Sequence, residues 1–279
     1  MTLDELVGFQ RAEFHVANVR RYWMLGLQAI TAVVAGVSVF VEDHTTLFIM
    51  AIASVVLAVA WGGVSWSYER HRDAGNRGRR ATLVVGGMGE PASASEMQQL
   101  REGFLVRDRT AKGYEDADYF ASSAKPGLQR MSEMISESAF WSRRLHHASA
   151  WAMFVAFVAL AVVLCLIVLA SIPMGDLTSR LVATRLVLAL VLLLLSTDVL
   201  GNVYGHWAAA TSIKDIDLRL RAAEQAGAKT SDTLLLLMDY NSAVERAPVV
   251  FPPVYKLLKA RLNGEWASYR GNANKPGAV

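Results

Sequence analysis

Residues 151–171 read WAMFVAFVALAVVLCLIVLAS, a run of 21 residues without a charged side chain. About 20 consecutive apolar residues in a helix cross the hydrocarbon core of a bilayer. The whole chain of 279 residues is 53% hydrophobic and only 19% charged, which is too apolar for an ordinary soluble domain. The stretch therefore predicts a membrane-spanning helix, and the composition predicts a membrane protein of the all-α class.

Three other segments are nearly free of charge. Residues 22–41 and 44–68 contain no Asp, Glu, Lys or Arg, and the run from Leu186 to Lys214 is interrupted only by Asp198. The connector inside each pair of segments is short, so each pair is expected to form an antiparallel hairpin. The predicted architecture is an all-α polytopic membrane protein with helical cytoplasmic segments and four transmembrane helices, at 22–41, 46–67, 149–171 and 185–207.

The basic residues determine the predicted orientation. Of the 28 Lys and Arg residues, only Arg180 and Arg185 lie outside the N-terminus, the central segment and the C-terminal tail. The positive-inside rule therefore places both termini and the central segment in the cytoplasm. The predicted divisions are a cytoplasmic N-terminal helix in 1–21, a first transmembrane hairpin in 22–67, a cytoplasmic linker with helices in 68–148, a second transmembrane hairpin in 149–207 and a cytoplasmic helical tail in 208–279.

Local patterns predict helices in the polar segments. Ser93 and Glu96 form an S-x-x-E capping box, so a helix is expected to start there and run towards Arg109. Another helix is expected from Leu128 into the third span, because apolar residues recur there at helical spacing. The residues expected to be buried on this helix are Met131, Met134, Ile135 and Trp141, with Tyr240, Tyr255 and Trp266 of the tail as their partners.

A polar stripe follows the most apolar part of the fourth span. Asp198, Asn202 and His206 stand four residues apart, so on a helix they share one face. A charge in the middle of a bilayer costs about 2.5–3.5 kcal/mol, so Asp198 is expected to face a partner or water. The stripe either lines a pore or a seam between subunits, or it forms an internal hydrogen bond, for example to Gln28 or Thr31.

Small residues favour close approach of helices. Ala148, Ala152 and Ala156 form such a face on the third span. A homo-oligomer is expected, although the same face also suits contacts within one chain.

A cluster of arginines follows the second span. One interpretation is a topology anchor that contacts anionic lipid headgroups. The other is a site for an anionic effector such as a nucleotide. The members of the cluster are Arg70, Arg72, Arg77, Arg79 and Arg80.

Motifs of known chemistry are weak in this sequence. Gly87 to Ala92 spell G-x-G-x-x-A after a strand-like run, but no βαβ unit fits around them, so a turn before the Ser93 helix is preferred. His146 and His147 are adjacent and would point about 100° apart on a helix, so they cannot hold one metal ion together. Both are expected at the membrane interface. With no catalytic constellation, the chain is expected not to be an enzyme and to use no metal or cofactor.

Three stretches resemble a known family when taken together. They are RRATLVVGGMG after the second span, YFASSAKPGLQRMSEMISESAFWSRRL before the third, and DYNSAVERAPVVFPPVYKLLKARLNGEW in the tail. With the spacing of the four spans, the chain resembles the SMODS-associated four-transmembrane effectors of bacterial antiphage (CBASS-type) defence. The resemblance implies a multi-pass protein of the inner membrane, activated by a cyclic nucleotide signal or by a nucleotide-sensing partner. It supplies no catalytic residues.

The function expected from these observations is permeabilisation or disruption of the inner membrane in an abortive infection response. Membrane lipids and further copies of the chain are the expected partners, and nucleic acid is not. The alternatives are a channel or transporter subunit and a structural membrane scaffold without a pore. Broken helices or inverted repeats would favour a transporter, and the sequence has neither.

Overall fold

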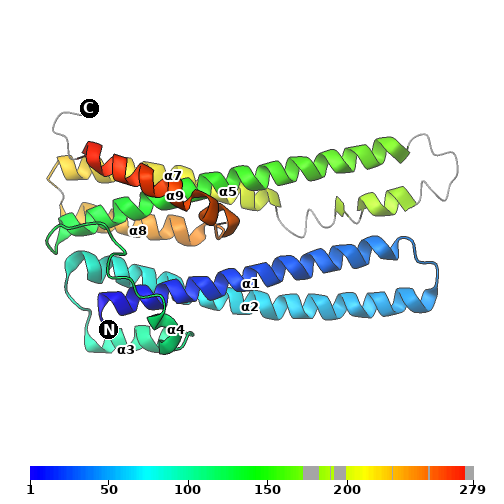
Figure 1. The fold of residues 1–279 in the computed structure, drawn as a ribbon, viewed down its shortest axis with the longest axis horizontal. Coiled ribbons are helices and arrows are strands. Elements are labelled where there is room, and N and C mark those ends of the chain that lie inside the picture. Colours follow the sequence, from blue (N-terminus) through cyan, green and yellow to red (C-terminus); the bar gives the residue numbers. More distant parts are fainter. Residues whose placement is uncertain (172–181, 189, 192–198, 228, 251, 274–279) are drawn as a thin grey trace. The chain divides into compact units, whose positions relative to one another are not determined.

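The computed structural model describes residues 1–171, 182–188, 190–191, 199–227, 229–250 and 252–273. Throughout these residues the regular structure is α-helix, as the sequence predicts, and no strand occurs among them (Figure 1). The helices are α1 (Leu3–Ser38), α2 (His44–Met88), α3 (Ala94–Gly103), α4 (Asp108–Lys112), α5 (Leu128–Ser171), α7 (Val199–Gln225), α8 (Thr230–Arg246) and α9 (Pro252–Ala273).

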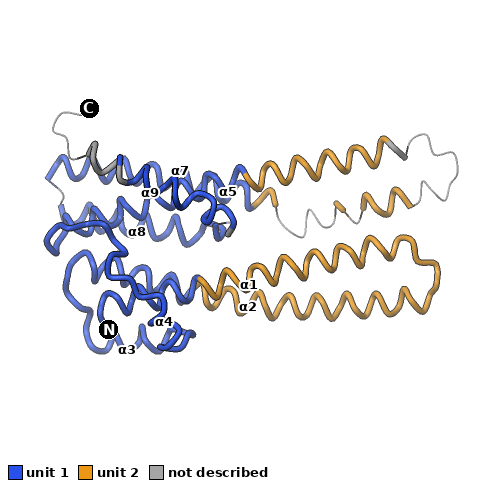
Figure 2. Tube along the Cα trace, in the orientation of Figure 1, with its two compact units in different colours: residues 1–14, 73–151, 202–279 blue, residues 15–72, 152–201 orange. Residues whose placement is uncertain are grey.

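The chain divides into two compact units (Figure 2). Unit 1 contains residues 1–14, 73–151 and 202–279, and unit 2 contains residues 15–72 and 152–201. Three long helices, α1, α2 and α5, each contribute one part to either unit.

The described part of unit 2 consists of apolar helices whose side chains are largely uncovered. α2 and α5 are long and apolar enough to cross a membrane, and the most apolar stretch of each has no buried residue. Core helices of soluble proteins bury such stretches, whereas Val59, on α2, is 72% exposed. Two of the four predicted spans thus have the length and composition that a membrane crossing requires.

The other two predicted spans are not shown. The span 22–41 is helical in α1 only to Ser38, and its shortened apolar stretch includes Gln28 and Thr31. The span 185–207 lies partly outside the described residues, and Asp198 is among the residues that are not described.

The main core of unit 1 joins α2, α5, α7 and α8. Met131, Met134 and Ile135 are fully buried on α5, in one cluster with Tyr240 of α8, as the sequence predicts. Trp141 is only half-buried, and Tyr255 on α9 is exposed, so the expected cover of α5 by the tail comes mainly from α7 and α8. The remaining buried members of the cluster are Leu83, Ala139, Ala209, Ile213, Ile216, Leu220, Leu236, Leu237 and Ala247.

The predicted capping box starts α3, but the helix is shorter than expected. The Glu96 backbone N–H donates to the Ser93 hydroxyl over 3.2 Å. The helix ends at Gly103 instead of continuing to Arg109, because Phe104 takes an extended backbone and stacks on Phe9 at 4.7 Å between ring centroids. The fully buried Glu13 carboxylate accepts the next two backbone N–H groups, those of residues 105 and 106.

The strand-like run before Gly87 is helical, and the glycine motif serves packing. A Cβ atom added to Gly87 would lie 2.5 Å from the Cβ of Met131, so α2 and α5 approach as closely as a glycine allows. Gly89 adopts a positive φ of 73°, donates its N–H to the Val85 carbonyl and ends α2. The β-branched residues of the run therefore belong to a helix that is fixed by its contact with α5.

Candidate functional site

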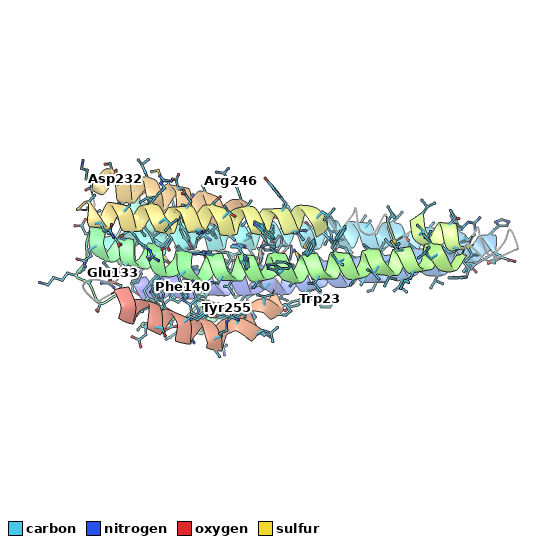
Figure 3. All side chains as sticks on the ribbon, turned by 90° about the horizontal axis from the view of Figure 1, so that it is seen from above. Trp23, Glu133, Phe140, Asp232, Arg246 and Tyr255 are labelled. Atoms are coloured by element: carbon cyan, nitrogen blue, oxygen red, sulfur yellow. The ribbon has the colours of Figure 1, made fainter. Side chains whose placement is uncertain are left out.

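An aromatic cavity of about 550 Å³ lies inside unit 1. Its lining comes from α1, α2, α5, α8, α9 and the loop 113–127, and seven of the lining residues are aromatic. Phe140 on α5 and Tyr255 on α9 mark two of these helices in Figure 3, and the rings of Phe140 and Trp266 lie 5.0 Å apart. A cavity of this size can hold a small ligand. The aromatic lining residues are Phe14, Tyr119, Phe120, Trp141, Tyr240, Tyr255 and Trp266.

Polar groups fix the loop side of the aromatic cavity. Arg11 donates to the Asp116 carboxylate and to the Tyr114 carbonyl, both over 3.0 Å. The Gln10 amide donates to the Tyr119 hydroxyl over 3.4 Å. Burial, with a smaller contribution from Tyr240, raises the pKa of Tyr119 to about 12, so its hydroxyl stays protonated.

Two buried polar atoms in the cavity lining lack a hydrogen-bond partner among the described residues. They are the side-chain oxygen of Gln10, a residue only 4% exposed, and the Nε of Arg79. Buried polar atoms are almost always paired, so one acceptor and one donor are available here to a ligand. Burial also lowers the pKa of Arg79 from its ordinary value.

The combination of groups suits a nucleotide base with its phosphate. Aromatic faces stack on any nucleotide base, whatever its identity, and a guanidinium binds phosphate oxygens. The carboxylates that border the aromatic cavity are partly engaged: Asp116 with Arg11, and Glu137 with the Ala121 N–H over 2.9 Å.

A buried histidine pair joins α5 to α7. The Nδ1 atoms of His146 and His206 lie 2.9 Å apart, and both side chains are buried. One ring must donate and the other accept, so at least the accepting imidazole must be neutral. Burial, then His206 and then Arg79, lower the pKa of His146 to about 3. His146 is therefore buried against α7 while His147 is exposed, and the expectation that both lie at the membrane interface stays a prediction.

His206 belongs both to the histidine pair and to the predicted polar stripe of Asp198, Asn202 and His206. His206 contacts a histidine of its own chain, an internal partner that the sequence did not suggest. Asn202 is half-buried one turn earlier on α7. Because Asp198 lies outside the described residues, both interpretations of the stripe stay predictions. Gln28 and Thr31 line an apolar cavity of about 800 Å³ in unit 2.

The arginine cluster separates along α2. Residues of a helix turn by about 100° each, so Arg77 and Arg79 point to nearly opposite faces. Arg79 and Arg80 both contact one carboxylate oxygen of Glu245, each over 3.3 Å. Arg79 thus enters the aromatic cavity, and Arg77 and Arg80 are exposed.

The first two arginines belong to unit 2. Arg70 is exposed, with its guanidinium 4.8 Å from the centre of the Trp66 ring. Arg72 pairs with Glu69 over 3.2 Å. The five arginines therefore do not surround one anion, although a role of the exposed ones at lipid headgroups stays a prediction.

Sequence reasoning did not find the aromatic cavity. Its only local signal is the aromatic content of the acidic loop, where Tyr114, Tyr119 and Phe120 occur within seven residues. In the described part of the chain, no group of three or more His, Cys, Asp or Glu side chains could hold a metal ion.

Comparison with known protein families, curated proteins and solved structures gives no match to this chain. The resemblance to four-transmembrane effectors therefore stays an expectation from the sequence.

Proposed function

We propose that this chain is an effector that permeabilises the bacterial inner membrane when a nucleotide signal occupies the aromatic cavity, in an abortive infection response to phage. The uncovered apolar helices would span the membrane as two hairpins, with both termini in the cytoplasm. The observation that carries the proposal is that α1, α2 and α5 each run from the unit containing the aromatic cavity into the apolar unit. A ligand that shifts these helices in unit 1 would shift the same helices in the membrane.

The residues of the aromatic cavity have distinct roles in this proposal. Tyr119, Tyr240 and Trp266 supply faces for a base, each stacking contact contributing about 1–3 kcal/mol. Arg79 donates a hydrogen bond to a phosphate oxygen. The side-chain oxygen of Gln10 accepts a hydrogen bond from an exocyclic amino group of the base. Arg79 contacts Glu245 of α8 through Nη2, so its unpaired Nε is the donor left for the phosphate.

A leakage experiment tests the proposal. The full chain is reconstituted into liposomes that contain a self-quenched dye, and cyclic dinucleotides and trinucleotides are added in turn. One of them is expected to start dye release, and inorganic phosphate is expected to have no effect. Release without any nucleotide would indicate a constitutive channel, and no release under any condition would indicate a scaffold; either outcome refutes the proposal.

A matched pair of variants locates the ligand. Gln10→Leu removes the buried acceptor at nearly constant volume, and Gln99→Leu makes the same change at an exposed position of α3. Loss of one buried hydrogen bond costs about 1 kcal/mol, so the nucleotide concentration for half-maximal release should rise about fivefold in Gln10→Leu only. Equal responses of the two variants would place the ligand elsewhere.

A further inference from the structure

A second cavity of unit 1, about 570 Å³ in volume, is lined by α5, α7 and α9. Four of its lining side chains are basic, and none of the described residues that line it is acidic. We call it the basic cavity. Its basic residues are Arg143 and Arg144 of α5, Lys214 of α7 and Arg261 of α9.

The basic cavity carries an excess of positive charge. Arg144 and Arg261 share one carboxylate, that of Glu265, each over 2.9 Å. Arg143 and Lys214 have no carboxylate partner among the described residues. Four cations against one carboxylate leave an excess of three (4 − 1). Such a group attracts a multivalent or phosphate-bearing anion.

Two tryptophans line the same cavity. The rings of Trp151 and Trp207 lie 6.1 Å apart, and each side chain is about half exposed. His147, also exposed, lies 6.1 Å from the Trp207 ring. Binding of a soluble anion does not require exposed indole rings. Tryptophans that contact hydrocarbon on one side and water on the other are typical of the headgroup level of a bilayer.

The position of the basic cavity on α5 points to the same ligand. Arg143 and Arg144 lie two turns before Trp151, which is the first residue of the uncharged apolar stretch 151–171. Along one continuous helix, the order is therefore cations, an exposed indole and then hydrocarbon. This order matches the phosphate, the glycerol region and the acyl chains of a phospholipid.

We propose that the basic cavity binds the phosphate of an anionic phospholipid, with Arg143 and Lys214 as its unpaired cationic contacts and the two tryptophans beside the glycerol and upper acyl region. The inference rests on the proposed membrane location but not on pore formation or nucleotide binding. It adds a lipid contact on α5, α7 and α9 to the one that the sequence predicts for the arginines of α2.

Lipid binding by the purified full chain tests this inference. Protein in neutral detergent is titrated with phosphatidylglycerol, with phosphatidylcholine, with glycerol 3-phosphate and with inorganic phosphate, and bound lipid is measured by native mass spectrometry. Phosphatidylglycerol is expected to bind. Phosphatidylcholine is expected to bind at least tenfold more weakly, a difference of about one charge contact. The two soluble phosphates are expected not to compete with phosphatidylglycerol. Competition by glycerol 3-phosphate at concentrations equal to the lipid would assign the basic cavity to a soluble phosphate compound and overturn the inference.

Charge-matched variants separate a built site from general surface charge. Arg143→Gln with Lys214→Gln removes two cations from the basic cavity, and Arg107→Gln with Arg109→Gln removes two exposed cations elsewhere in unit 1. The first pair should weaken phosphatidylglycerol binding by about tenfold or more, and the second by less than about twofold. Equal weakening in both would overturn the inference. Lys214→Gln alone changes one exposed side chain and should give an intermediate loss; an unchanged affinity would also overturn it.

The two proposals fail in different measurements. Lipid binding in detergent needs neither a bilayer nor a nucleotide, so it can persist in a chain that never releases dye. Nucleotide-dependent dye release with no preference for anionic lipid would overturn the lipid site alone.

Discussion

Replacing Gly87 with Ala tests the close contact between α2 and α5. The added Cβ would lie 2.5 Å from the Met131 Cβ and 2.7 Å from its Cα, about 1 Å inside the usual carbon–carbon contact distance. Because one of these atoms is backbone, rotation of the Met131 side chain cannot relieve the clash, and the helices must separate. Overpacking of this kind costs up to about 3 kcal/mol, and the better helix propensity of Ala returns about 1 kcal/mol. The net destabilisation should be about 2 kcal/mol.

Gly264→Ala provides the matched control. Gly264 lies on α9, is exposed and has no atom within 4 Å of an added Cβ, so the substitution should stabilise the helix by about 1 kcal/mol. The assay is thermal unfolding of the purified full chain in one detergent, where 1 kcal/mol corresponds to about 2–4 °C for a chain of this size. Gly87→Ala should lower Tm by about 4–8 °C, and Gly264→Ala should raise it by about 2–4 °C. An unchanged or higher Tm for Gly87→Ala would refute the close packing of α2 against α5.

Three further predictions concern topology, the tail and the stripe. Reporter fusions after Asp43 should read outside the cell and fusions after Gly89 inside, and an inside signal at Asp43 would overturn the proposed hairpins. Trp141→Ala should lower the free energy of unfolding by about 2 kcal/mol, as measured by thermal unfolding; this is below the range for a fully buried Trp because Trp141 is half-buried. An unchanged Tm would show that α5 and the tail are not one packed unit at this position. Asp198→Leu should keep insertion but abolish nucleotide-dependent dye release, while Asp198→Asn should alter only the cation preference of ion flux; full release from Asp198→Leu would make Asp198 a packing residue.

Helical periodicity predicted the parts of the fold that local sequence can encode. The spacing of Met131, Met134 and Ile135 gave the buried face of α5 correctly, since the core contacts one stripe of that helix. The Ser93 cap was also predicted, because a capping hydrogen bond joins residues three apart. The run before Gly87 was misread, because β-branched residues favour strands only weakly and the contact with Met131 outweighs that preference.

The candidate site depends on contacts between distant parts of the chain. His146 and His206 are 60 residues apart, and nothing in either local pattern indicates that they meet. Gln10 reaches Tyr119 across 109 residues. The arginine cluster shows the opposite failure: Arg77 and Arg79 are neighbours in sequence, yet the helical turn sends only the second into the aromatic cavity.

Acid should destabilise unit 1 through the histidine pair. The pKa of His146 is lowered from 6.5 to about 3 by burial, His206 and Arg79, so between these pH values the unfolded chain binds a proton that the folded chain excludes. The contribution of His146 to the free energy of unfolding is therefore fully present above pH 6.5. It decreases as the pH falls, by about 1.4 kcal/mol per pH unit, or about 2 kcal/mol at pH 5. His146→Gln keeps a hydrogen-bonding side chain next to His206 and removes this titration, while every other ionisable group stays the same. The measurement is Tm between pH 5 and pH 7 for both proteins: the wild-type chain should lose stability more steeply than the variant, and parallel curves would show that the His146 side chain accepts a proton as readily in the folded as in the unfolded chain.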